Sequence, residues 1–202
     1  MLPLKSVAKM LRMRALAVCI LILLKIAFPL SAQTDSLLIS FSPLTREQTA
    51  VYQAFFADYR HRGGAEIINV AEVTDILQPD EGDYSGCMSD FPRSSPAKVG
   101  HRLSEDFAKQ NHLRIVDPRV HKVLDPEEAI SRGQSVEGAV ELGFKSGFLT
   151  LSEIIFDANH KRAAFHYSFR CGGLCGHVET VVYEKRHGIW KASERSCGFG
   201  IS

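Results

Sequence analysis

The chain has 202 residues, with 24 Lys and Arg against 23 Asp and Glu, and its formal net charge is +1. Residues 33–202 keep 19 of the basic residues and all 23 acidic ones, a net charge of −4, and contain no basic cluster. This balance argues against nucleic acid as a partner. A stretch of 170 residues suits one domain with its own core.

The first 32 residues have the layout of a secretory signal peptide. Basic residues without an acidic one precede the unbroken apolar run 15–24, and Ser31-Ala32 places small residues before Gln33. The alternative is an uncleaved membrane anchor, but the apolar run is shorter than the ~20 residues of a spanning helix. We expect cleavage after residue 32, a secreted or periplasmic protein, and no membrane span in the mature chain.

The segment from Arg46 to about Arg60 is predicted to be an amphipathic helix. Thr45 and Gln48 have the spacing of a capping box. Apolar side chains then recur every three or four residues: Val51, Tyr52, Phe55, Phe56 and Tyr59.

The middle of the chain predicts less regular structure. Residues 65–76 are rich in branched side chains and predict a strand. Residues 77–100 combine Pro and Gly with Ser and Asp, which predicts a long loop that holds Cys87. Short helices are expected within residues 104–111 and 127–131, whereas residues 134–146 give no clear pattern.

The C-terminal region predicts the sheet. Residues 148–157, 162–170, 177–185 and 189–197 form successive strands joined by short turns. We therefore predict an α+β fold, with a C-terminal four-stranded antiparallel meander packed against the helix of residues 46–60.

Within residues 162–170 the side chains alternate in polarity. Ala163, Phe165, Tyr167 and Phe169 are expected to face the core. Ala164, His166, Ser168 and Arg170 are expected on the opposite face, whether it meets solvent or a partner.

Four cysteines follow the predicted cleavage point: Cys87, Cys171, Cys175 and Cys197. An even number in an exported chain predicts disulfides, and three pairings are possible. We favour Cys171–Cys175, which closes the loop between two strands, together with Cys87–Cys197. Crossed pairings, free thiols and metal binding stay open.

Several C-terminal motifs occur together. They are Leu151-Ser152 with Phe156-Asp157, Ala163, the loop Cys171-Gly-Gly-Leu-Cys175-Gly176, and Glu184-Lys185 followed by Gly188, Trp190 and Lys191. In these the chain resembles a group of exported bacterial proteins of unknown function, strongly over roughly residues 147–202 and more weakly before them. The resemblance implies a small exported α+β protein and carries over no activity and no functional residue. Cys87 and Cys197 are not part of the family pattern, which implies a second bridge in this member.

Two alternatives assign chemistry to these residues. Cys171, Cys175, His177 and His187 supply zinc ligand types. His166 or His177 with Glu179 could serve a hydrolase, if they lie together on the polar face of the hairpin. The sequence contains no G-x-S-x-G, H-E-x-x-H, phosphate-binding or dinucleotide-binding motif.

We therefore expect a non-catalytic binding or interaction module that recognises a protein or a small molecule, with no assigned catalytic residue and no cofactor. The expected contact surface is formed by the loop of residues 77–100 and by the hairpin loop. The hairpin residues are Gly172, Gly173, Leu174, Gly176 and His177.

Overall fold

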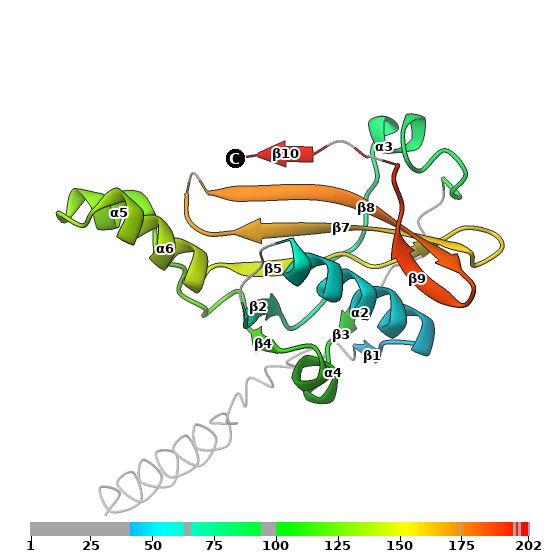
Figure 1. Ribbon diagram of the computed structural model, residues 1–202, viewed down its shortest axis with the longest axis horizontal. Helices are drawn as coiled ribbons and strands as arrows, with labels where there is room; N and C mark the ends of the chain where they lie inside the picture. The colour runs from blue at the N-terminus through cyan, green and yellow to red at the C-terminus, as the bar shows by residue number, and fades with distance from the viewer. Residues whose placement is uncertain are drawn as a thin grey trace, which may run out of the picture. The chain divides into compact units, whose positions relative to one another are not determined.

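The protein contains a mixed eight-stranded sheet with helices arranged around it (Figure 1). The computed structural model describes residues 41–62, 66–93, 100–173, 175–195, 197 and 199–201, which all belong to one compact unit, residues 40–202. The predicted signal peptide lies outside the described residues. No helix within these ranges is long and apolar enough to cross a membrane.

The described helices and strands have the following bounds. The helices are α2 (Arg46–His61), α3 (Glu81–Ser85), α4 (Glu105–Gln110), α5 (Pro126–Ser131) and α6 (Val136–Ser146). The large sheet contains β2 (Ile68–Ala71), β4 (Leu113–Val116), β5 (Phe148–Leu151), β6 (Ile155–Phe156), β7 (Arg162–Arg170), β8 (Gly176–Arg186), β9 (Ile189–Ala192) and β10 (Phe199–Ile201). A separate small sheet pairs β1 (Ser42–Pro43) with β3 (His101–Arg102).

The topology confirms the α+β class and corrects the expected four-stranded meander. β5, β7, β8 and β9 do pair antiparallel in succession, but β2 pairs in parallel with both β4 and β5. The N-terminal half therefore contributes two strands to a mixed sheet. All four residues of β2 are buried, so β2 has no alternation of apolar and polar residues that would reveal its place beside a parallel neighbour.

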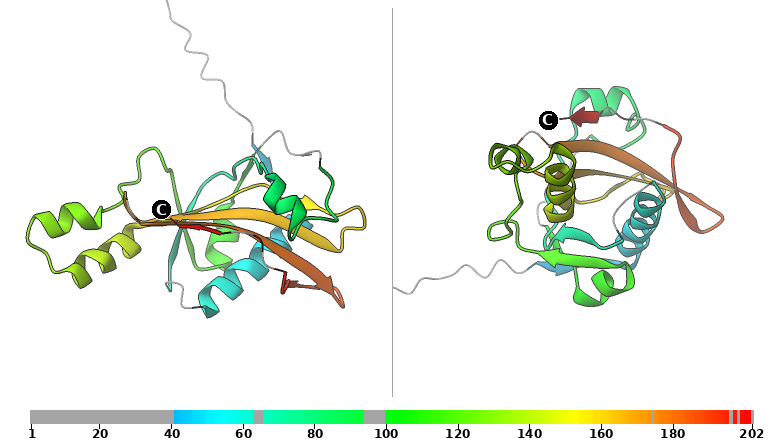
Figure 2. Two further views of the ribbon diagram at one scale, coloured as in Figure 1. Left: turned by 90° about the horizontal axis from the view of Figure 1, so that it is seen from above. Right: turned by 60° about the vertical axis from the view of Figure 1, so that its left-hand side comes forward.

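The first core lies between α2 and one face of the sheet (Figure 2). The predicted helix and its Thr45–Gln48 capping box are both present. Phe55 is fully buried, and its ring makes an edge contact with Phe165 of β7 at 5.3 Å between centroids. Burial of a side chain of this size stabilises the fold by roughly 1.5–3 kcal/mol.

The second core lies on the opposite face, where sequence analysis placed a loop. Asp80 and Asp83 form a capping box at the start of α3, and the segment that follows buries Met88 and Phe91. These side chains pack with Ala164 of β7. The segment of residues 77–93 is thus a cover for the sheet, with a short helix that its Pro and Gly content concealed.

A buried carboxylate connects the small sheet with α2. Glu153 is 1% exposed, and one of its oxygens lies 2.7 Å from Nδ1 of His101. Nε2 of Gln48 donates to the same oxygen at 3.3 Å, and the Thr74 hydroxyl donates to the other oxygen. This side chain is therefore fully hydrogen-bonded inside the protein, as a buried polar group must be.

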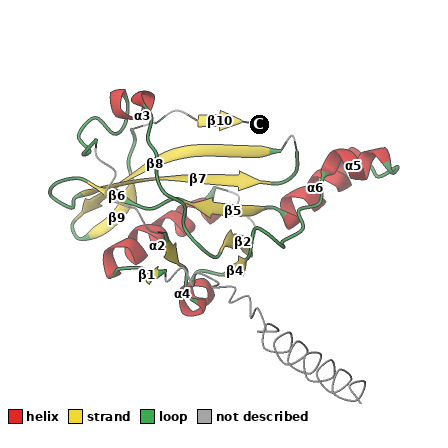
Figure 3. Cartoon of the chain, turned by 180° about the vertical axis from the view of Figure 1, so that it is seen from behind, coloured by secondary structure: helices red, strands yellow, loops and turns green. Residues whose placement is uncertain are grey.

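The helices α5 and α6 lie side by side at the end of the sheet where β7 leads into the Cys171 loop (Figure 3). Pro126 occupies the first turn of α5, and Ser135 caps α6. The sequence of α6 contains Gly138 and Gly143, which are poor helix formers. This composition explains why residues 134–146 give no clear pattern.

Phe55→Ala is expected to lower the free energy of unfolding by about 3–5 kcal/mol, because it removes a fully buried ring from the first core. Urea denaturation followed by circular dichroism measures this change. Val120→Ala is the control, since Val120 is 80% exposed, and should change stability by no more than about 0.5 kcal/mol. Equal effects of the two substitutions would contradict the placement of α2.

Candidate functional site

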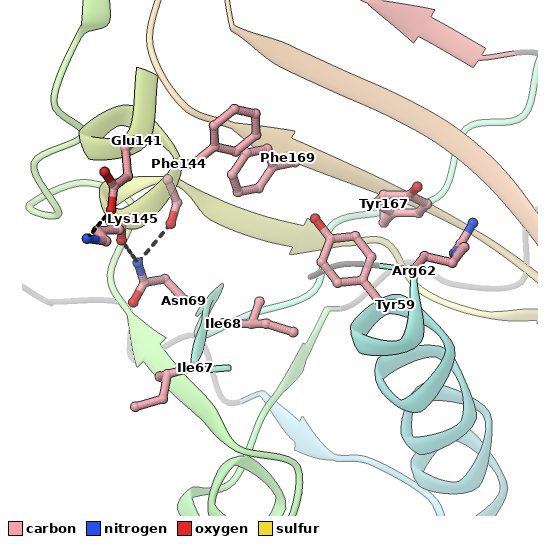
Figure 4. A pocket seen from close by; sticks show the side chains of 11 residues that line it. Tyr59, Arg62, Ile67, Ile68, Asn69, Glu141, Phe144, Lys145, Tyr167 and Phe169 are labelled. Carbon is pink, nitrogen blue, oxygen red and sulfur yellow. Dashed lines mark hydrogen bonds and ion pairs between the residues drawn. The ribbon is translucent and has the colours of Figure 1, made fainter. Parts of the chain in front are cut away.

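A pocket of about 420 Å³ opens on the α2 side of the sheet (Figure 4). It lies where the end of α2, β2, α6 and β7 meet, and this volume is typical of small-molecule sites. Its lining residues are Tyr59, Arg62, Ile67, Ile68, Asn69, Glu141, Phe144, Lys145, Gly147, Tyr167 and Phe169.

One wall of the pocket is aromatic. The rings of Phe144 and Phe169 are stacked, with 5.7 Å between centroids and 13° between planes. Phe144 is 54% exposed, and Ile67 on the other side of the pocket is 53% exposed. Large apolar side chains that gather at a pocket and remain open to water are typical of binding surfaces.

The polar groups of the pocket differ in how they are engaged. Lys145 forms an ion pair with Glu141 at 2.6 Å. Asn69 donates through Nδ2 to the backbone oxygens of Lys145 and Gly147, at 3.1 and 2.8 Å, and so fastens the end of α6 to β2. Asn69 thus joins two walls of the pocket, whereas the ion pair lies within α6.

The polar groups of Arg62 and Tyr59 are not engaged in this way and are available for contact with a ligand. Within the described ranges Arg62 has no ion-pair partner. The Tyr59 hydroxyl points into the pocket (Figure 4). Burial raises the pKa of Tyr59, and the charge of Arg62 offsets part of that rise. At neutral pH the pocket lining therefore offers the neutral Tyr59 hydroxyl and the Arg62 guanidinium, which point in different directions (Figure 4).

A polar cluster adjoins the pocket at Tyr167. The Tyr167 hydroxyl donates to Glu179 Oε2 at 2.7 Å and lies 2.9 Å from His177 Nε2. Burial, and then the hydrogen bond to Glu179, raise the pKa of Tyr167 well above its ordinary value. The phenol thus stays protonated and fixes the positions of His177 and Glu179.

Of the two histidines considered with Glu179 for a hydrolase site, His177 lies near Glu179 and His166 does not. Paired residues of neighbouring strands share a face, and Glu179 is paired with Tyr167. His166 is therefore on the other face, where its Nε2 lies 3.4 Å from Asp83 Oδ2. His177 and Glu179 do meet, at 3.3 Å, but no described serine or threonine hydroxyl contacts His177.

The cysteine pairs at disulfide distance are those of the favoured pairing. Cys87 is joined to Cys197 and Cys171 to Cys175, with 5.0 Å between Cα atoms in each pair. The two bridges lie apart in the fold, since Cys87 and Cys197 belong to the second core.

The zinc ligand set of Cys171, Cys175, His177 and His187 does not assemble. His187 lies in the turn after β8, about 33 Å along an extended strand from His177. In the described part of the chain, the residues that come together as metal-ligand types are Asp83, Cys87 and Cys197. Both sulfurs of that group belong to a disulfide.

The predicted contact loop packs against α5. The backbone N–H of Gly173 donates to Asp125 Oδ2 at 3.0 Å, and Gly172 adopts a positive φ of 136°. Gly176 begins β8, His177 belongs to the Tyr167 cluster, and Leu174 lies outside the described residues. The hairpin loop is thus partly occupied by contacts within the protein.

Comparison with known proteins assigns no family, because no family model, no curated protein and no solved structure matches the chain. Sequence analysis also missed most of the pocket, including Arg62, Asn69 and Phe144. One pattern could have indicated it. Val136, Val140 and Phe144 follow one another at four-residue spacing along α6, and all three are exposed.

The tyrosines give a testable pH dependence. Burial raises the pKa of Tyr52, Tyr167 and Tyr183 above its ordinary value. Because the folded protein holds these protons more tightly than the unfolded chain, their contribution to stability is complete below about pH 10 and is lost as the pH rises beyond it. The expected result is a free energy of unfolding that falls above pH 10.

Absorbance at 295 nm, recorded together with circular dichroism, tests this expectation. The three buried tyrosines should ionise only as the protein unfolds, whereas all five tyrosines of the chain should ionise near pH 10 in guanidinium chloride. Ionisation of the full set near pH 10 with an unchanged dichroism spectrum would contradict the described burial.

Proposed function

We propose that the protein is an exported, disulfide-stabilised, non-catalytic binding protein, which holds a small organic anion in the pocket between α2, β2, α6 and β7. The observation that carries this proposal is the combination of an open aromatic wall with a guanidinium that has no ion-pair partner among the described residues. The wall is Phe144 stacked on Phe169, and the guanidinium belongs to Arg62.

The two parts of the pocket fit the two parts of such a ligand. A flat apolar body would pack against Phe144 and Ile67, which now face water, and would gain roughly 25 cal/mol for each Å² buried. A carboxylate or sulfonate would pair with Arg62, whose planar fork suits oxygen pairs. The Tyr59 hydroxyl would donate a further hydrogen bond.

Export and the secreted or periplasmic location belong to the same proposal. Two features support them: the signal-peptide layout of residues 1–32 and two cysteine pairs at disulfide distance. The motifs shared with exported bacterial proteins point in the same direction.

A hydrolase acting through His177 and Glu179 is the second candidate. Its support is that Tyr167 lines the pocket and joins both side chains. This candidate predicts hydrolysis of a p-nitrophenyl ester that disappears in His177→Ala. A wild-type rate equal to that of His177→Ala would remove it.

Titration with two fluorescent probes tests the binding proposal. One is the anionic dye 1-anilinonaphthalene-8-sulfonate, and the other is neutral N-phenyl-1-naphthylamine, which lacks the sulfonate. Arg62→Met should raise the dissociation constant of the anionic probe about 10-fold or more, because it removes a charge-assisted hydrogen bond. The dissociation constant of the neutral probe should not change. Phe144→Ala should raise the dissociation constants of both probes.

Matched controls are Arg114→Met and Val120→Ala, both at exposed residues outside the pocket lining. Neither control should change the affinity of either probe. Binding that is the same in Arg62→Met, Phe144→Ala and their controls would overturn the proposed site.

A further inference from the structure

We propose that the Cys171–Cys175 disulfide is a redox-sensitive latch, which sets the affinity of the pocket by holding α5 and α6 in place. The proposal rests on the binding function above and adds its regulation. Three successive contacts connect the disulfide loop with the pocket wall.

The first contact joins the loop to α5. Asp125 caps α5 by accepting from the backbone N–H of Glu127 at 2.9 Å, and its other oxygen accepts from Gly173 at 3.0 Å. A Cβ added at Gly172 would lie 2.7 Å from Cδ of Pro126. The loop therefore packs so closely against the first turn of α5 that residue 172 must be glycine.

The second contact joins α5 and the loop to α6. A Cβ added at Gly143 would lie 2.7 Å from Cγ of Pro126 and 2.9 Å from the carbonyl oxygen of Cys171. The backbone of α6 at residue 143 thus touches both the first turn of α5 and one of the bridged cysteines.

The third contact joins α6 to the pocket. Phe144 follows Gly143 directly, and it stacks on Phe169, which precedes Cys171 by two residues. Gly147, at the end of α6, lies so close to Phe169 that an added Cβ would come within 2.6 Å of that ring. Both rings of the aromatic wall are thereby positioned next to the disulfide loop.

The two disulfides differ in access to a reductant at one sulfur. Cys171 is buried and Cys175 is half-buried, whereas Cys87 and Cys197 are both buried in the second core, so a reductant would attack at Cys175. A dithiol would reduce the Cys171–Cys175 bond by thiol–disulfide exchange, in which two electrons and two protons convert it into two thiols while the dithiol becomes a disulfide.

Reduction of the Cys171–Cys175 bond would loosen the loop and, through it, the contact with α5. Without the covalent link, the backbone hydrogen bond from the Cys171 N–H to the Cys175 carbonyl oxygen at 2.9 Å still joins the two residues, but the loop between them is less constrained and spends less time in the shape that donates to Asp125. The helices α5 and α6 then sample further positions, so the fraction of molecules with a formed aromatic wall falls. The apparent dissociation constant rises as that fraction falls.

The mature chain carrying Cys171→Ser and Cys175→Ser together tests the latch. We expect at least about fivefold weaker binding of 1-anilinonaphthalene-8-sulfonate, in the range of ordinary coupling between sites. Hydrogen exchange of the α6 amides should become faster, while that of α2 stays unchanged. Asp125→Ala leaves the disulfide intact and should reproduce both effects.

Cys87→Ser with Cys197→Ser is the matched control, and it should leave exchange in α6 as in the wild type. Wild-type affinity and wild-type exchange of α6 in both latch variants would overturn the proposal. If the serine pair does not fold, limited dithiothreitol treatment of the wild type, with peptide mapping of the reduced bridge, gives the same two measurements. Failure of the wild type to bind the probe would reject the proposed function, and exchange in α6 would still decide the latch.

Discussion

The alternation of side chains along β7 is the constraint on which the rest of the structure depends. Phe165 and Tyr167 face α2, and Ala164, which directly precedes Phe165, faces the segment after α3, so one strand contributes to both cores. The same alternation separates His166 from Glu179. A shift of register by one residue would exchange the two faces and remove both cores and the pocket. The strand that sets the fold therefore also sets the site.

The parts of the fold that could be predicted from the sequence are those that local patterns of residues specify. The helix α2 has a complete capping box and an apolar stripe, and β7 and β8 alternate over their length, so each is specified by its own residues. The parallel pairing of β2 with β4 and β5 depends on contacts between segments distant in the chain. The helix α6, with two glycines inside it, depends on its packing against Pro126. These long-range contacts cannot be deduced from local patterns, although the Ser135 cap and the spacing of Val136, Val140 and Phe144 are local signals for α6.

The pocket could not be predicted from the sequence for a related reason. Its walls come from four segments that lie far apart in the sequence, near residues 59–62, 67–69, 141–147 and 167–169. Tyr59 and Phe169 were expected to be core residues, and they are half-buried because α2 ends and the sheet continues past it. Spacing predicts which face a side chain occupies. It does not predict how much of that face a packed helix covers.

Satisfaction of polar groups distinguishes the two chemical candidates. Glu153 is enclosed by His101, Gln48 and Thr74, and Tyr167 engages both His177 and Glu179, so each cluster completes its hydrogen bonds within the protein. Completed networks of this kind stabilise one arrangement of the fold. Arg62 and the open face of Phe144 have the opposite character, since their partners in the described chain are few and both border a pocket. Groups that the fold leaves unsatisfied beside a pocket are those with the most free energy to gain from a ligand, which is why we propose binding ahead of catalysis.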